Sequence, residues 1–328
     1  MKSEGNTIIP CACGTFARGA WYTGLLFGYK LDTDRFDQMQ PSPAPSIQSI
    51  RLPGGLQVWN APQARFDTLF LYRENFIRRC YEQHGVTLRD GDAILDVGAN
   101  VGMFALSVMQ RFRQLRIYCF EPVPNTYACL TRNVTESRLG GGHEVTTFNF
   151  GLGAADGQIT LEFFPGAPSN STQYSVEKRQ VFTKGLGALR WLDLWKINKR
   201  AALLLLPFYP FRERLFGRGF ERVMAGGTSI TCEVRTLSRI IDERRLERVD
   251  LLKIDVEGAE MDVLAGIEDR HWPRIRQLAM EIEPANRPHV PALQDRLRLL
   301  GFARVETESM FHGANSGNAL CMLYAVRA

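Results

Sequence analysis

The sequence predicts an α/β fold built around a mostly parallel sheet, and two observations carry that prediction. Short apolar runs with strand character alternate with helically spaced segments over most of the 328 residues. The run at 94–97 leads into a glycine-bearing turn at 98–102, after which the apolar pattern resumes at helical spacing. A second run at 116–120 delivers an acidic residue, Glu121, 23 positions after Gly98. Ligands of such sheets bind at the carboxyl ends of the strands.

The individual elements follow from residue spacing and from turn residues. Residues 1–65 are expected to form an extension with a proline-rich stretch at 41–45 and a hairpin around Gly54-Gly55. A helix is expected over 67–84, because apolar side chains recur there at helical spacing, and Gly85 is its expected stop. The further predicted strands are 93–97, 116–120, 144–149, 158–164, 230–234 (expected to pair with 158–164), 249–254, 275–282, 302–307 and 319–326, and the further predicted helices are 102–112, 124–135, 236–245, 258–268 and 290–300.

The composition is typical of a soluble globular protein, with 45% hydrophobic and 23% charged residues. The seven cysteines are scattered and several lie in apolar runs, which predicts free thiols and a reduced, cytoplasmic setting. The five histidines form no helical ligand pair, and Cys11 and Cys13 are too close for the usual zinc spacing. No secretory pattern opens the chain, and the longest apolar stretch, around 201–211, is too short to span a membrane.

Positive charge is concentrated in one segment. Residues 178–222 hold eleven lysines and arginines against three acids, whereas the whole chain carries a net charge of +5, so the remainder is slightly acidic. This segment is expected to be an insertion with a helix, which in its simplest form packs on the sheet as a cap. Three other roles stay open: a lid over an apolar substrate, a dock for an acyl or peptidyl carrier protein, and a surface in peripheral contact with anionic lipid.

The glycine turn lacks the middle glycine of the dinucleotide fingerprint, which favours a ligand without a diphosphate, and S-adenosylmethionine (SAM) is the candidate. Gly98 and Gly102 let the backbone approach a bound molecule closely. Asp96, at the strand end, is expected to reach the turn N–H groups or the ligand ammonium. Asn100 can take a left-handed backbone conformation or bind the ligand carboxylate. Glu121 is placed to accept hydrogen bonds from ribose hydroxyls.

Six motifs extend this interpretation from about residue 66 to 305. In this order they resemble those of the FkbM-type SAM-dependent methyltransferases, while 1–45 and 178–222 lie outside the resemblance. The motifs are FLYRE at 70–74, LDVGANVG at 95–102, FEP at 120–122, 166–172 with its Asn-Ser-Thr, VRTL at 234–237 and LLKIDVEGAE at 251–260.

The resemblance implies the class I methyltransferase fold, a Rossmann-like sheet of seven mostly parallel strands whose last strand is antiparallel. It also implies O-methylation of a hydroxyl on a small molecule, a natural-product intermediate or a sugar. Residues 66–177 would form the SAM-binding half of the domain and 223–328 its C-terminal half. The expected SAM contacts are Tyr72, Asp96, Gly98, Asn100, Val101, Gly102, Glu121, Pro122, Asn149, Gly151 and Asp255.

Four carboxylates are expected at the ligand edge. Asp255 and Glu257 follow one predicted strand, and Glu281 and Glu283 end the next. Methyl transfer to oxygen requires the acceptor hydroxyl to be aligned and its proton removed, and a carboxylate can do both. Many relatives carry Glu, an apolar residue and His where this chain has Glu281-Ile282-Glu283. The choice of base among the four therefore stays open.

Four neighbouring carboxylates would repel one another unless positive charge lies among them. The sequence allows three sources of that charge. Lys253 and Arg235 could neutralise the acids, or the SAM sulfonium could. A hard divalent ion such as Mg²⁺ could also bind, with Asp255, Glu281 and Glu283 as its ligands.

Rival functions are weighed against the same residues. An NAD-dependent enzyme is disfavoured by the missing glycine. An RNA or other nucleic-acid methyltransferase would use 178–222 as its binding element. Against it, the chain has no Asn-Pro-Pro-Tyr and no Pro-Cys motif, and its aromatic residues are not interleaved with the basic ones. A non-catalytic SAM-binding or carrier-docking module is the alternative that is not an enzyme.

Overall fold

The computed structural model describes residues 46–137, 139–171, 227–309 and 320–328. The expectations for 1–45 and for the insertion 178–222 therefore lie outside the described residues. None of the helices within these ranges combines the length and the apolar character that crossing a bilayer demands. The five cysteines of the described part are all buried and free, in agreement with the prediction of unpaired thiols.

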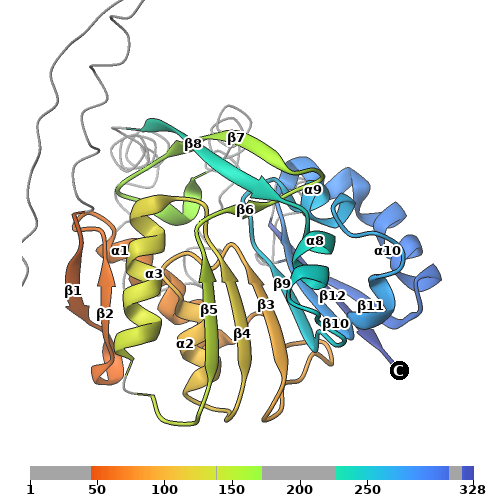
Figure 1. Ribbon diagram of the computed structural model, residues 1–328, viewed down its shortest axis with the longest axis horizontal. Coiled ribbons are helices and arrows are strands. Elements are labelled where there is room, and N and C mark those ends of the chain that lie inside the picture. Colours follow the sequence, from red (N-terminus) through yellow and green to blue (C-terminus); the bar gives the residue numbers. More distant parts are fainter. Residues whose placement is uncertain (1–45, 138, 172–226, 310–319) are drawn as a thin grey trace, which may run out of the picture. The chain divides into compact units, whose positions relative to one another are not determined.

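A seven-stranded sheet forms the centre of the fold (Figure 1). Its strand order is β11-β12-β10-β9-β3-β4-β5, and the five strands from β10 to β5 run parallel. The last strand, β12, is antiparallel to both of its neighbours. The predicted mostly parallel sheet with an antiparallel last strand is thus confirmed. The strands are β3 (Ala93–Val97), β4 (Arg116–Phe120), β5 (Glu144–Phe148), β9 (Leu251–Ile254), β10 (Gln277–Ile282), β11 (Phe302–Ser309) and β12 (Cys321–Arg327).

Two apolar layers cover the two faces of this sheet, because successive side chains of a strand point to opposite faces. Ile94 of β3 packs with residues of α2 and α3, whereas its neighbour Leu95 packs with residues of α8, α9 and α10. All four residues of β9 are buried, as expected for a strand covered on both faces. The helices are α2 (Met103–Met109), α3 (Pro124–Glu136), α8 (Leu237–Glu243), α9 (Glu260–Ala265) and α10 (Val290–Leu299).

Two smaller sheets flank the core. The predicted N-terminal hairpin is present as antiparallel strands β1 and β2. The predicted pairing of 158–164 with 230–234 is confirmed, since β7 and β8 are antiparallel. They belong to a separate three-stranded sheet with β6, which follows the carboxyl end of β5 (Figure 1). The strands are β1 (Gln48–Arg51), β2 (Gln57–Asn60), β6 (Gly151–Leu152), β7 (Gly157–Phe163) and β8 (Thr228–Arg235).

The helix predicted over 67–84 is wrong at its C-terminal end. Helix α1 (Arg65–Tyr72) continues into one π-helical segment, η3 (Arg73–Arg78), and ends at Arg79. Arg79 takes a left-handed backbone conformation with φ of 52°, which no α-helix continues through. The residues that follow form a loop, so Tyr81 lies in this loop and not on the helix. A π segment inside a helix is frequent at functional sites.

Three short 3₁₀ helices and one longer one complete the described part of the chain. The predicted helix over 258–268 is shorter in the structure because Glu257 and Gly258 both have positive φ. Glu260 then begins α9, and its carboxylate accepts the N–H of Gly258. The 3₁₀ helices are η2 (Pro53–Gly55), η4 (Pro168–Asn170), η6 (Trp272–Arg274) and η7 (Pro284–His289).

Candidate active site at the carboxyl edge of the sheet

The glycine turn joins β3 to α2 by close backbone contact. The N–H groups of Gly98 and Ala99 both donate to the carbonyl of Phe120, at 3.1 and 2.9 Å. Gly98 has a φ of 74°, and a Cβ placed there would lie 1.8 Å from the backbone oxygen of Asp255. Only glycine satisfies both conditions. The turn is therefore held against the ends of β4 and β9, as a ligand-binding turn at a sheet edge requires.

Asn100 adopts the left-handed conformation that the sequence allows, with φ of 50°. Its side-chain oxygen accepts the N–H of Val101 at 2.7 Å. Its own N–H donates to Glu121 at 3.0 Å, and the second oxygen of Glu121 accepts the N–H of Val123 at 3.0 Å. Burial raises the pKa of Glu121 to about 7, although both N–H donors oppose that shift. Each Glu121 oxygen keeps a lone pair with which it could accept a hydroxyl donor.

The other residues predicted for the adenosine side lie beside Glu121. The Asn149 amide donates to the backbone oxygens of Glu121 and Pro122, at 3.0 and 3.1 Å. A Cβ on Gly151 would lie 3.6 Å from Pro122. The structure therefore brings the predicted residues of the β3, β4 and β5 ends together. Their contacts with SAM stay predictions.

Lys253 connects two of the predicted acids. Its Nζ lies 3.0 Å from Asp96 Oδ1 and 3.7 Å from Asp255 Oδ2, and it donates to the carbonyl of Gly98 at 2.8 Å. Burial lowers the pKa of Lys253, but Asp96 and Asp255 more than offset this, so the pKa lies above its ordinary value. Asp96 is fully buried behind the turn. Its carboxylate is thus enclosed by protein, with Lys253 as its charge partner, and its predicted contact with the ligand ammonium stays a prediction.

Asp255 has a second partner that the sequence did not indicate. The Tyr81 hydroxyl donates to Asp255 Oδ2 at 2.7 Å, and Tyr81 is 2% exposed. Both partners of Asp255 thus reach Oδ2, while Oδ1 has no partner among the described residues. Tyr81 was missed because its spacing fitted the predicted helix over 67–84. No local pattern could have identified it, since its partner follows β9, 174 positions along the chain.

The other predicted acids occupy different places around the edge. Glu281 lies on the same face of the sheet as Lys253. Ala279, two residues before Glu281 on β10, pairs with Lys253, and alternate residues of a strand point to the same face. The charge of Glu281 raises the pKa of Tyr81, a smaller cause than burial and Asp255. Glu283 immediately precedes η7, and its charge adds to burial, the main cause, in raising the pKa of Glu260. Glu257 lies in the left-handed turn before α9.

Lys253 and Arg235 differ in their relation to the predicted acids. Lys253 pairs with Asp96 and Asp255, whereas Arg235 pairs with Glu233 at 2.6 Å and stacks over Phe150. Of the two basic residues expected to neutralise the acids, Arg235 is therefore engaged elsewhere. Among the described residues, no group of three or more histidines, cysteines or acids is arranged to hold a metal ion. The Mg²⁺ alternative gains no support from the structure.

Tyr72 packs against apolar and aromatic side chains. Its ring stacks on Phe76 with centroids 4.8 Å apart. Both rings lie against an apolar cluster that includes Val101 and residues of the β1–β2 hairpin. Helix α1 and η3 therefore lie beside the ligand turn. The Ser107 hydroxyl of α2 strengthens this arrangement by donating to the carbonyl of Asn75.

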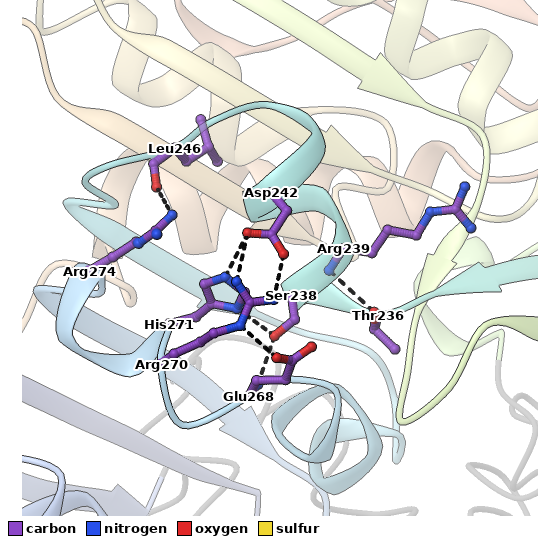
Figure 2. A network of polar contacts seen from close by, with 9 residues as sticks. All are labelled: Thr236, Ser238, Arg239, Asp242, Leu246, Glu268, Arg270, His271 and Arg274. Atoms are coloured by element: carbon purple, nitrogen blue, oxygen red, sulfur yellow. Dashed lines mark hydrogen bonds and ion pairs between the residues drawn. The ribbon is translucent and has the colours of Figure 1, made fainter.

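A second polar network resembles a hydrolytic triad but is structural (Figure 2). His271 contacts Ser238 Oγ at 2.7 Å and Asp242 Oδ1 at 3.0 Å. His271 is fully buried, Ser238 is 1% exposed, and the Ser238 hydroxyl oxygen already accepts the N–H of Glu268. No substrate could reach this serine. The network links α8 to the segment between α9 and η6. Arg270 adds an ion pair, with its Nη2 2.7 Å from Asp242 Oδ2.

Comparison with known proteins identifies the family. The family model described as the Methyltransferase FkbM domain matches residues 96–303. Methyltransferase 1 of Beauveria bassiana (strain ARSEF 2860) is 30% identical over 237 residues, covering 72% of this chain and 82% of that protein. Methyltransferase sdnD of Sordaria araneosa is 32% identical, covering 70% and 81%. The 31-O-demethyl-FK506 methyltransferase FkbM of Streptomyces tacrolimicus is 34% identical, covering 72% and 82%.

The matched region contains the glycine turn, Glu121 and the Lys253–Asp255 strand end. The fold also has the predicted topology. The chain therefore belongs to the FkbM methyltransferase family, a family of SAM-dependent enzymes.

Proposed function

We propose that this chain transfers the methyl group of SAM to a hydroxyl of a small molecule, such as a natural-product intermediate or a sugar. The observation that carries the proposal is the state of Asp255. Its Oδ2 is held by Tyr81 and Lys253, while Oδ1 has no partner among the described residues. A fixed carboxylate with one available oxygen, beside the glycine turn, can align a hydroxyl and take its proton.

When bound, SAM supplies a methyl carbon activated by its positively charged sulfur. The residues present fit it, because Gly98 leaves no room for a side chain and Glu121 can accept further donors. Asp255 Oδ1 would accept the acceptor proton while the new O–C bond forms and the electron pair of the C–S bond stays on sulfur. Tyr81 and Lys253 would keep the other oxygen still during this displacement.

The names of two relatives support oxygen as the acceptor atom. One is the 31-O-demethyl-FK506 methyltransferase already described. The other is the 2-O-methyltransferase NoeI of Sinorhizobium fredii (strain NBRC 101917 / NGR234), 28% identical over 53% of this chain and 56% of that protein. Both names specify transfer to oxygen. We extend that acceptor atom, but neither relative's substrate, to this chain.

A carrier-bound acceptor is a further form of this proposal. The chain is 32% identical to part of the AMB antimetabolite synthetase AmbE of Pseudomonas aeruginosa (strain ATCC 15692 / DSM 22644 / CIP 104116 / JCM 14847 / LMG 12228 / 1C / PRS 101 / PAO1), covering 80% of this chain but 12% of that protein. A related unit thus forms part of a much longer synthetase. Transfer to one acceptor, offered free and attached to a carrier protein, compares the two forms directly.

The test of the proposal separates binding from transfer. Calorimetry with S-adenosylhomocysteine (SAH), with and without Mg²⁺, establishes cofactor use and any metal requirement. Methyl-labelled SAM is then incubated with hydroxyl-bearing small molecules, sugars and bulk RNA. We expect label on a hydroxyl, and expect Asp255→Asn to keep SAH binding while losing transfer. Asp269→Asn, with a side chain 91% exposed, is the matched control. Label on RNA alone, or full transfer by Asp255→Asn, would reject the proposal.

A further inference from the structure

Glu74 is a buried acid whose carboxylate has no partner among the described residues. It lies on the π segment η3 and is 5% exposed. Among the described residues, its carboxylate makes no hydrogen bond and no ion pair, although its backbone oxygen accepts the N–H of Cys80. A carboxylate that is largely removed from water and has no protein donor gains when a ligand supplies one. The other buried acids in these ranges all have partners, which are donors or cations near Asp67, Asp92, Asp96, Glu121, Asp250 and Glu260.

The charges around Glu74 do not offset the effect of burial on its pKa. Burial raises its pKa to about 8, and the charge of Asp255 raises it further. Lys253, whose Nζ lies 3.0 Å from Asp96, opposes this shift as the smallest of the named causes. The remaining groups that act on Glu74 are Arg78, which lowers its pKa, and Asp67, which raises it, while Glu74 in turn raises the pKa of Cys80 and Tyr81.

We propose that Glu74 binds the ammonium group of SAM and releases a proton to solvent when it does so. The inference rests on SAM being the cofactor. An ammonium supplies both things that Glu74 lacks, a positive charge and N–H donors, whereas the sulfonium supplies charge alone. The role expected for Asp96 passes to Glu74, because Asp96 is fully buried and pairs with Lys253.

The proton release follows from the protonation of the Glu74 carboxyl group before the ligand binds. With a pKa of about 8, Glu74 is mostly protonated at pH 7 in the ligand-free chain. An ammonium next to the carboxylate favours the ionised form, so the proton leaves as the ligand arrives. SAH and SAM both carry this ammonium. Methylthioadenosine lacks the amino-acid moiety and provides the matched ligand that keeps only the adenosine side.

The experiment is calorimetry at pH 7 in phosphate and in Tris, whose ionisation enthalpies differ widely. For the unchanged chain we expect SAH binding to release close to one proton and methylthioadenosine binding to release none. Glu74→Gln, which imitates the protonated acid in shape, should bind SAH roughly tenfold to hundredfold more weakly, by the loss of a charged hydrogen bond, and release no proton. Its affinity for methylthioadenosine should not change.

Glu260→Gln is the control variant. Glu260 is also buried with a pKa raised to about 7, but it bonds Gly258 and Asn286 near α9. Its proton release on SAH binding should equal that of the unchanged chain. SAH binding without buffer dependence, or equal affinity in Glu74→Gln, would overturn the assignment of Glu74 and leave the proposed function standing. Failure of the unchanged chain to bind SAH at all would instead overturn SAM use itself.

Discussion

Tyr81 and Asp255 lie 174 positions apart in the chain, and the Tyr81 hydroxyl donates to the Asp255 carboxylate at 2.7 Å. Tyr81 follows the left-handed Arg79 that ends η3, whereas Asp255 follows β9. The bond therefore links the segment that covers the sheet edge to the strand end that carries the proposed base. Because Lys253 reaches the same carboxylate oxygen, the other oxygen has a fixed direction.

The first prediction concerns this bond. Tyr81→Phe removes the hydroxyl and little else, so Asp255 loses one of its two anchors. Hydrogen bonds to charged groups contribute about 1.5–3 kcal/mol, which corresponds to a fall in the transfer rate of roughly tenfold to hundredfold. The affinity for SAH should stay unchanged. Steady-state rates and calorimetry measure both, and Tyr127→Phe, whose hydroxyl contacts Thr147, is the control. An unchanged rate in Tyr81→Phe would contradict a positioning role.

The second prediction concerns Lys253. Lys253→Met leaves Asp96 buried without its counter-charge, and breaking a buried ion pair in this way costs about 3–5 kcal/mol of unfolding free energy. Asp96→Asn should restore part of that loss in the double variant, because the uncompensated charge is removed. Urea unfolding of the two single variants and the double variant gives the coupling. If the two losses simply add, the pair does not interact as the structure indicates.

The sequence was sufficient for elements that are short, buried and bounded by turns. The strands at 93–97 and 116–120 have the predicted bounds, because both are mostly apolar runs that end at a turn. The glycine turn was also readable, since Gly98 and Asn100 are residue types that tolerate positive φ. The order of strands followed from the family resemblance rather than from any single run.

The sequence was insufficient where distant segments meet. Apolar residues recur at helical spacing beyond Arg79. The helix predicted over 67–84 is therefore too long, and the prediction puts Tyr81 in that helix. The pairing of Asp96 with Lys253 depends on the register of β3 against β9, which neither strand encodes alone. The sequence alone therefore leaves Asp96 between the turn N–H groups and the ligand ammonium, and it does not indicate Lys253 as the partner. Among the described residues the Glu74 carboxylate has no partner because of how distant segments pack around it, and no residue pattern predicts that packing.

The third prediction concerns the turn itself. Gly98→Ala places a Cβ 1.8 Å from the backbone oxygen of Asp255 and imposes a positive φ on a residue that avoids it. The end of β9 must then move away from β3. We expect loss of SAH binding together with a lowered unfolding midpoint. Gly157→Ala has open space around its Cβ and should change neither calorimetric affinity nor thermal unfolding. Normal SAH affinity in Gly98→Ala would show that the turn and Asp255 are not in contact.

The last prediction is a pH dependence of stability. His84 follows Tyr81 in the same loop, and its two ring nitrogens lie 2.6 Å from Glu306 and 2.9 Å from Glu308. A histidine donates from both nitrogens only when protonated. Its pKa is therefore raised, mainly by the bond to Glu308, with burial opposing and Glu306 adding to the increase.

A histidine whose pKa is higher in the folded chain binds its proton more tightly there, so it stabilises the fold fully below the unfolded pKa of about 6.5. That stabilisation disappears as the pH rises through the folded pKa. His84→Asn tolerates the positive φ of 50° at this position but carries no titrating charge. The difference in unfolding free energy between the two chains, measured in urea from pH 5 to pH 9, should narrow as the pH rises. Parallel curves would mean that His84 is not protonated between the two glutamates, and that the loop carrying Tyr81 is held by its other contacts alone.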